Sequence, residues 1–322
     1  MSHNLNIRSD GRASMMYVGD APWHNLGQQL DHPATAEEAI EAANLDYTVV
    51  KKPLQAVIHG KRRIDVPDYF ATVRTDTQEA LGVVGSRYSP VQNRDAFGFF
   101  DTLVGSDEAI YETAGVLNRG ERIWILARLP GYIRLLGKDV VQKYLLLYNS
   151  HDGSSMIRAK LTPTRVVCNN TLSVALAGME QEVRIKHTPS AMEKLEEAHK
   201  LLGLSNSVYD LLESIFKRMS LTKVTDKQLL RYVETLIPDN PESESKARTE
   251  NIRQTILNLH QAVEDAKVIR GTAFGAYNAV TEYSDHMTAV KDPNRRLNSI
   301  WFGGSEKLKV KAFQLAQDLL LN

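Results

Sequence analysis

The sequence has one cysteine among its 322 residues, Cys168. A lone cysteine cannot form a disulfide within the chain or supply a cysteine-rich zinc site, so both kinds of cross-link are excluded. This composition is typical of a reducing compartment, and we expect the protein in the cytoplasm. Cys168 follows two valines, where a free cysteine is usually a small buried residue. A nucleophile with His151 as its base is the less favoured alternative.

Long apolar runs and net charge are also missing. The first residues, MSHNLNIRSDGRASMMYVG, contain no apolar segment of signal-peptide length, and no run elsewhere approaches the length of a membrane span. Lys and Arg total 39, and so do Asp and Glu, so the formal net charge is zero. The chain as a whole therefore has no electrostatic attraction to nucleic acid or to a membrane surface, and we expect no membrane partner.

The common catalytic and cofactor motifs are absent as well. The sequence contains no GxSxG, no Walker loop, no dinucleotide fingerprint and no HExxH. Gly82 and Gly85 are too few glycines in too short a stretch to cradle a phosphate. We therefore expect a binding protein without a cofactor rather than an enzyme.

Charge is nevertheless unevenly distributed along the chain. Between Asn118 and Asn170 the sequence has nine Lys/Arg and three Asp/Glu, a local net charge of +6. The remainder carries −6, because the total is zero. Such an asymmetry indicates a surface that attracts an anionic partner.

The hydrophobic pattern predicts an α+β protein. Short β-type runs at 47–50, 54–59, 68–74 and 80–84 are separated by turn signals, and further strands follow up to residue 162. A capping box, Thr35 to Glu38, begins an early helix, and Asn93 is expected to cap the next one. Beyond about residue 190 only helical spacing remains. We predict an antiparallel β-meander with helices packed on it in residues 1–187, and an α-helical domain in residues 188–322.

The stretch SHDGSSMIRAKLTPTRVVCNNTL, residues 150–172, holds most of the candidate chemistry. His151 and Asp152 precede a glycine and two serines, which favours a tight turn over a metal site. Asn169 and Asn170 are expected to begin a helix as caps. Two asparagines exceed what capping needs, so one could face a ligand or a neighbouring subunit.

Arg158 and Lys160 alternate within a predicted strand, so they point from the same face. With basic residues of neighbouring strands they would form a stripe that follows a phosphate backbone, although a solvated sheet face would also carry charges. The candidate nucleic-acid contacts are Arg122, Arg128, Arg134, Lys143, Arg158, Lys160, Arg165, Asn169 and Asn170.

Several motifs resemble a known family in the order in which they occur. These are RASMMYVGDAPWHNLGQQL, VVGSRYSPVQNRDAF, SHDGSSMIRAKLTPTRVVCNNTL, GTAFGAYNAVTEYSDH and WFGGSEKLKVKAFQLA. They are similar to the phage/plasmid-like protein family built on domain of unknown function nine hundred and thirty-two. The resemblance implies a mobile-element protein in a bacterial host cell. The architecture is also similar, at the level of fold alone, to single-strand annealing proteins of the RecT and Red-beta type, which form rings or filaments along DNA.

Three functions therefore stay open. The first is a homo-oligomeric protein that binds single-stranded DNA or RNA, with strand annealing in recombination as a role that would fit. The second is a protein-binding accessory factor of a mobile element, such as an inhibitor of a host defence system. The third is a metal-dependent hydrolase that uses His151 and Asp152.

Overall fold

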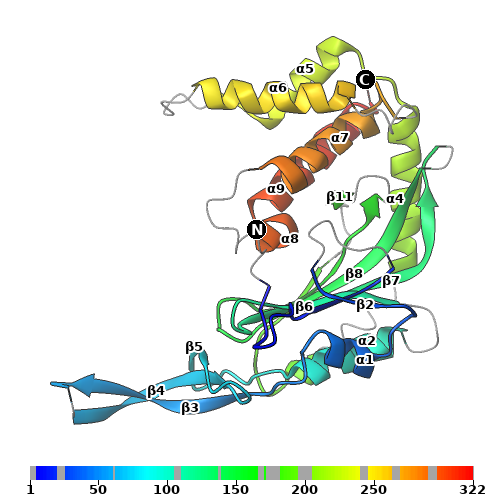
Figure 1. Cartoon of the computed structure of the whole chain (residues 1–322). Helices are drawn as coiled ribbons and strands as arrows, with labels where there is room; N and C mark the ends of the chain where they lie inside the picture. The colour runs from blue at the N-terminus through cyan, green and yellow to red at the C-terminus, as the bar shows by residue number, and fades with distance from the viewer. Residues whose placement is uncertain are drawn as a thin grey trace. The chain divides into compact units, whose positions relative to one another are not determined.

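The structure is a computed structural model that describes residues 5–19, 26–60, 62–104, 110–136, 139–165, 170–171, 182–194, 205–239, 246–262, 269–288 and 296–321. The chain divides into two compact units (Figure 1). The first comprises Met1–Pro130, Tyr144–Leu161 and Glu182–Ser205, and the second Gly131–Lys143, Thr162–Gln181 and Asn206–Asn322. The boundary predicted after residue 187 stays a prediction, because units that interleave along the chain do not define a single boundary.

A large, mainly antiparallel sheet forms the centre of the first unit. Its strands there, in hydrogen-bonded order, are β2 (Gln28–Leu30), β1 (Met15–Val18), β6 (Ile110–Leu117), β7 (Arg122–Arg134), β8 (Val140–Ser150), β9 (Ile157–Leu161) and β12 (Glu182–Ile185). The consecutive strands β6 to β9 are neighbours, which is the predicted meander. The pair β1–β2 is parallel. The α+β class expected from the sequence is confirmed.

A smaller antiparallel sheet and two helices complete the first unit. The sheet has the order β3 (Val49–Ile58), β4 (Arg62–Arg74) and β5 (Ala80–Gly85). The helices are α1 (Ala36–Ala42) and α2 (Asn93–Val104). The predicted capping box before α1 is present: Thr35 accepts from the Glu38 amide, and the Glu38 carboxylate accepts from the Thr35 amide. Asn93 differs from the prediction, because its side-chain oxygen is bonded to the His151 ring.

Close cross-strand packing explains the buried face of the large sheet. Gly115 on β6 lies opposite Trp124 on β7. A Cβ atom at Gly115 would lie 2.2 Å from the indole, so only glycine leaves room for the ring. Trp124 is 3% exposed, and its Nε1 donates to the Thr113 hydroxyl. Large apolar burial of this kind is the main stabilising contribution to a fold of this size.

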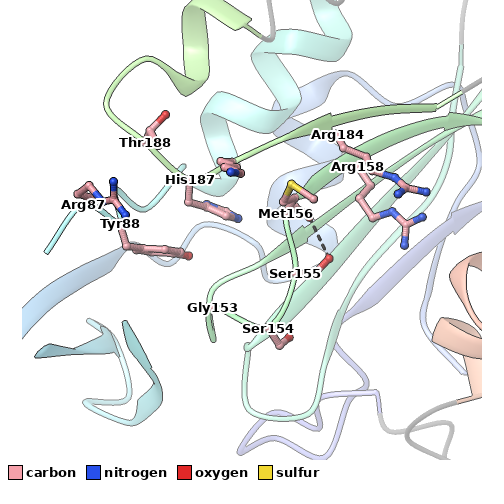
Figure 2. Close-up of a pocket in the computed structure, with 11 residues that line it drawn as sticks. Arg87, Tyr88, Gly153, Ser154, Ser155, Met156, Arg158, Arg184, His187 and Thr188 are labelled. Carbon is pink, nitrogen blue, oxygen red and sulfur yellow. Dashed lines mark hydrogen bonds between the residues drawn. The ribbon is translucent and has the colours of Figure 1, made fainter. Parts of the chain in front are cut away.

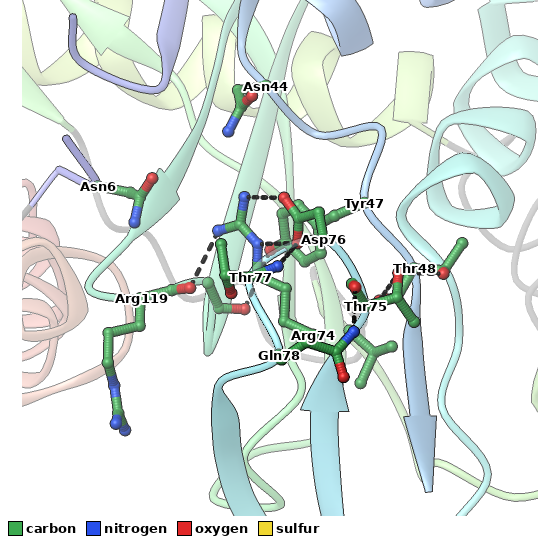
Figure 3. A network of polar contacts seen from close by, with 12 residues as sticks. Asn6, Asn44, Tyr47, Thr48, Arg74, Thr75, Asp76, Thr77, Gln78 and Arg119 are labelled. Carbon is green, nitrogen blue, oxygen red and sulfur yellow. Dashed lines mark hydrogen bonds and ion pairs between the residues drawn. The ribbon is translucent and has the colours of Figure 1, made fainter. Parts of the chain in front are cut away.

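A buried arginine fixes the base of the small sheet to the large one (Figure 3). Arg74, at the end of β4, is 2% exposed. Its guanidinium lies 3.9 Å from the centroid of the Tyr47 ring and pairs with Asp76 at 2.7 Å. It also donates to the carbonyl of Arg119 at 3.0 Å, in the turn between β6 and β7. Tyr47 donates to the carbonyl of Gly120 in the same turn.

The second unit is mainly helical. Its elements are the short strands β10 (Thr164–Arg165) and β11 (Asn170–Thr171), the helices α4 (Ser205–Leu221), α5 (Asp226–Leu236), α6 (Lys246–Ala262), α7 (Ala273–Glu282), α8 (Arg296–Phe302) and α9 (Gly304–Asp318), and the π-helical turn η2 (Tyr283–Met287). Phe216, Phe274, Tyr277 and Phe313 form its aromatic core, with ring centroids 5.3 to 6.3 Å apart. None of the helices in the described ranges is both long and apolar enough to cross a bilayer.

The prediction that a helix begins at Asn169 or Asn170 is wrong at Asn170. Asn170 and Thr171 form β11 and pair with β10 in antiparallel register, Arg165 opposite Asn170. Pairing with a strand several residues away overrides the local capping preference of asparagine. Cys168 and Asn169 lie outside the described residues, as do residues 172–181.

Candidate functional site

A basic cleft in the first unit is the candidate site (Figure 2). Its volume is about 580 Å³, within the usual range for small-molecule sites. The residues that line it are Arg87, Tyr88, Gly153, Ser154, Ser155, Met156, Arg158, Arg184, Lys186, His187 and Thr188. They come from the segment after β5, the β8–β9 loop, β9, β12 and the segment after β12. We call this feature the cationic cleft.

Four cations line the cationic cleft, and none of its lining residues is acidic. They are Arg87, Arg158, Arg184 and Lys186. Arg87 and Lys186 are exposed, and no ion pair of either is found within the described part of the chain. Several like charges with few counter-charges raise the local concentration of anions.

Two of the cations are held together by a carboxylate behind them. Arg158 and Arg184 are opposite each other in the β9–β12 register. Glu182 accepts from Arg158 Nε through one oxygen and from Arg184 through the other at 2.8 Å. Burial would raise the pKa of Glu182, but the two guanidinium hydrogen bonds lower it below its usual range. The carboxylate thus stays charged and sets the two guanidinium groups side by side (Figure 2).

A stacked ring pair forms another part of the wall. The rings of Tyr88 and His187 have centroids 4.7 Å apart and an interplanar angle of 22°. His187 is 6% exposed, and neither ring nitrogen has a hydrogen-bond partner within the described structure. Burial lowers the pKa of His187 to about 4, against an opposing effect of the Asp152 charge. The imidazole is therefore neutral at pH 7, and both of its ring nitrogens are shielded from solvent.

The β8–β9 loop closes one side of the cleft, and its shape depends on Asp152 and Gly153. Asp152 accepts hydrogen bonds from Ser150 and from the Ser154 amide, and pairs with Arg122 at 3.2 Å. Gly153 has φ of +75°, and a Cβ there would lie 2.9 Å from a Val84 methyl group. The loop therefore packs directly against β5, and this position needs glycine.

The opposite segment is fixed by Lys51. This side chain donates to the carbonyls of Ser86 at 2.7 Å and Tyr88 at 2.9 Å. Tyr88 donates through its hydroxyl to the carbonyl of Ser150, and the amide of Ser89 donates to the carbonyl of His187. The aromatic wall is consequently bonded to the elements on both sides of it.

The structure does not bring the sequence-predicted cations together as one open stripe. Arg122 is paired with Asp152, Arg128 with Glu112 and Arg158 with Glu182. Glu112 and Glu182 lie outside residues 118–170, so the charge of that segment overstates the charge of the folded surface. Of the predicted contacts described with their side chains, only Arg158 lines the cleft.

The remaining predicted contacts lie elsewhere. Lys160 is 7% exposed and is buried in β9. Arg134 donates to the Tyr132 hydroxyl, and Lys143 lies 5.3 Å from the Tyr209 ring centroid, all in the second unit. The side chains of Arg165 and Asn170 are outside the described structure, as is all of Asn169.

His151 occupies a structural position. It is fully buried, its Nε2 lies 2.8 Å from the Asn93 Oδ1, and its ring meets Tyr47 edge-on. Burial lowers its pKa to about 3. Across the described ranges, no group of three or more His, Cys, Asp and Glu is placed to hold a metal ion. Residues 151–155, between β8 and β9, form a series of bends rather than the predicted tight turn.

Comparison with known proteins identifies the family. The sequence model described as domain of unknown function (DUF932) matches residues 80–301. The chain belongs to this family. No curated protein sequence and no solved structure matches the DUF932 chain. The similarity to single-strand annealing proteins therefore rests on the sequence-based expectation alone.

The residues of the cleft lie within the matched part of this DUF932 protein, but most were missed from the sequence. The run Val183-Arg184-Ile185-Lys186-His187 carries a signal that was available, because Arg184 and Lys186 alternate as Arg158 and Lys160 do. The sequence around Arg87 and Tyr88 shows no such signal. These two residues line the cleft only because the segment after β5 folds beside residues 153–158 and 184–188.

Proposed function

We propose that this DUF932 protein binds single-stranded nucleic acid in the cationic cleft. The observation that carries the proposal is the lining of four cations without a carboxylate, beside a stacked aromatic pair. Phosphate groups are the usual partners of clustered Arg and Lys, and bases stack on aromatic rings.

Inorganic phosphate would contact a smaller part of the cationic cleft than an oligonucleotide would. Arg158 and Arg184 together present forked donors suited to one phosphate. The stacked pair offers an apolar and aromatic surface that an inorganic anion does not need. An oligonucleotide should therefore compete more strongly than a mononucleotide, and a mononucleotide more strongly than inorganic phosphate. Strand annealing in recombination is the finer form of this proposal.

Removing two of the cleft's cations, for which no ion pair is found among the described residues, tests the proposal with little risk to folding. Arg87→Gln with Lys186→Gln should weaken the binding of a single-stranded oligonucleotide at low salt. The log–log slope of affinity against salt should become shallower by about 1.4, since each phosphate contact on a single strand contributes about 0.7. Fluorescence anisotropy titrations over a salt series measure both quantities.

The matched control removes two cations from the second unit. Arg134→Gln with Lys143→Gln changes the net charge equally but leaves the cleft intact, so its affinity and slope should stay close to those of the unchanged protein. A larger loss in the control than in the cleft variant would favour the strand stripe predicted from the sequence. Absence of oligonucleotide binding at about 50 mM salt, where such contacts are strongest, would refute the proposal.

A further inference from the structure

The β3–β4 hairpin continues well beyond the small sheet as a two-stranded arm (Figure 1). Strand β5 pairs with β4 at Tyr69–Val73. Beyond that point, Gln55–Ile58 pair with Arg62–Asp65, and no third strand is paired with them within the described residues. All of these arm residues are exposed or half-buried. We call the described residues Gln55–Gly60 and Arg62–Asp65 the arm.

The hairpin that carries the arm is anchored at its other end. There, just outside β3 and β4, the hydroxyls of Thr48 and Thr75 lie 2.7 Å apart, next to the buried Arg74 (Figure 3). Along the arm, the Gln55 amide donates to the Asp65 carboxylate at 2.8 Å across the two strands. At its end, His59 and Gly60 both have positive φ, 48° and 78°, as tight hairpin turns require. An isolated hairpin is marginally stable, so these contacts matter for holding the arm extended.

The arm combines positive charge near its end with apolar side chains on both faces. Arg62 and Arg63 are exposed, and no ion pair of either is found within the described chain. The sequence adds Lys61, which lies outside the described residues, and only Asp65 is acidic between residues 51 and 66. Val57 is 63% exposed and Ile64 40%, and the register puts them on opposite faces.

We propose that the arm enters a groove of double-helical nucleic acid. The two strands lie about 4.8 Å apart, and a major groove about 12 Å wide admits a two-stranded ribbon. Groove walls are lined by phosphates, which the exposed arginines would contact from either strand. Apolar side chains on both faces would then meet base edges and sugars. A protein partner would bind the apolar faces but does not call for exposed arginines that have no ion pair among the described residues, and this difference in charge selects nucleic acid.

The arm and the cationic cleft are different surfaces, and they suit different forms of nucleic acid. The cleft suits a single strand, because a stacking platform needs an unpaired base. The arm suits a duplex, because a ribbon needs a groove. A protein with both could hold a single strand and a neighbouring duplex at once.

The test compares duplex and single-stranded binding by the full-length protein. Arg62→Ala with Arg63→Ala should weaken the binding of a short blunt duplex about tenfold or more at about 50 mM salt, and should make its salt slope shallower by about 1.8. Binding of a single-stranded oligonucleotide should be unchanged. The charge-preserving variant Arg62→Lys with Arg63→Lys should retain most of the duplex affinity. Circular dichroism and the melting temperature check that the exposed substitutions leave the fold intact.

Each other result would overturn the inference. If the unaltered protein does not bind duplex, the inference about the arm is wrong. The cleft proposal would still stand, because it is tested by the binding of a single-stranded oligonucleotide. An equal loss for both ligands would assign the arginines to a shared surface. Unchanged duplex binding together with a changed molecular mass in solution would show that the arm docks on a second copy of the chain.

Discussion

At the scale of single residues, two of the histidines buried in the described structure, His151 and His187, lie in the first unit. His151 is 0% exposed and His187 is 6% exposed. Besides burial, the pKa of His151 is affected by three nearby groups, His187, Asp152 and Arg74. Burial disfavours the charged form of both rings. They are therefore neutral in the folded protein and become protonated readily only when the chain unfolds.

The depressed pKa values predict a loss of stability on acidification. The folded-state pKa of His151 is about 3 and that of His187 about 4, whereas an unfolded histidine titrates near 6.5. Below 6.5 the unfolded chain binds protons that the folded chain does not, so stability falls as pH decreases toward the folded values. Each histidine should contribute about 2 kcal/mol to the loss between pH 7 and pH 5.

A histidine variant separates this contribution from those of carboxylates. His151→Gln keeps a side-chain donor for Asn93 but has no proton to gain. Urea unfolding at pH 7 and pH 5 should show a smaller loss for this variant than for the unaltered protein. Equal losses would mean that His151 is protonated in the folded state, contrary to its burial.

Single residues were predictable from the sequence where their role is local. Arg158 was predicted as a contact on an alternating strand and does line the cleft. Its partner Glu182 was not predicted, because the pair forms only when β12 lies beside β9. The same reason hides the stacking of Tyr88 on His187, two residues that are far apart in the sequence.

At the scale of elements, the capping box was predictable from the sequence, whereas the single-residue caps expected at Asn93 and Asn170 were not. The predicted capping box at Thr35 is present, and Thr225 makes the same arrangement with Gln228, because the hydrogen bonds of a capping box join residues three apart. Within α4, apolar residues do not all lie on the buried face: Leu211 is 38% exposed, while Phe216 is fully buried in the aromatic core. Helical spacing defines a face, but the neighbouring helices decide which edge of that face is covered.

Two glycine substitutions test how closely the β8–β9 loop packs against β5. Gly153 and Gly11 both have positive φ, 75° and 82°, but only Gly153 has a neighbour in the way of a Cβ. Gly11→Ala should cost about 1–2 kcal/mol, from left-handed backbone strain alone. Gly153→Ala should cost about 1–3 kcal/mol more, because the methyl group meets Val84. It should also weaken oligonucleotide binding by displacing the cleft wall.

Denaturant unfolding of the two glycine variants measures the difference. Similar free energies of unfolding for both would show that the loop moves away from β5 without penalty. In that case the wall of the cleft is adaptable, and Gly153 is present for its backbone conformation only.

At the scale of the whole molecule, a zero net charge hides two cationic surfaces. The cationic cleft and the arm both belong to the first unit, one at the loops of the large sheet and the other beyond the small sheet. The cleft lies within residues 80–301, which match the family, whereas the arm precedes them. The hydrophobic pattern predicted the fold class but not these surfaces, because they depend on which carboxylates the folded chain brings to each arginine.

Photo-cross-linking of a bromouracil-containing single strand to the unaltered protein tests the central claim most directly. Bound in the cationic cleft, the strand should label peptides that contain Tyr88 and His187, and an excess of unmodified single strand should suppress the labelling. Arg87→Gln with Lys186→Gln should reduce it at equal protein concentration. Labelling confined to residues 131–143, or labelling that no competitor suppresses, would contradict the account.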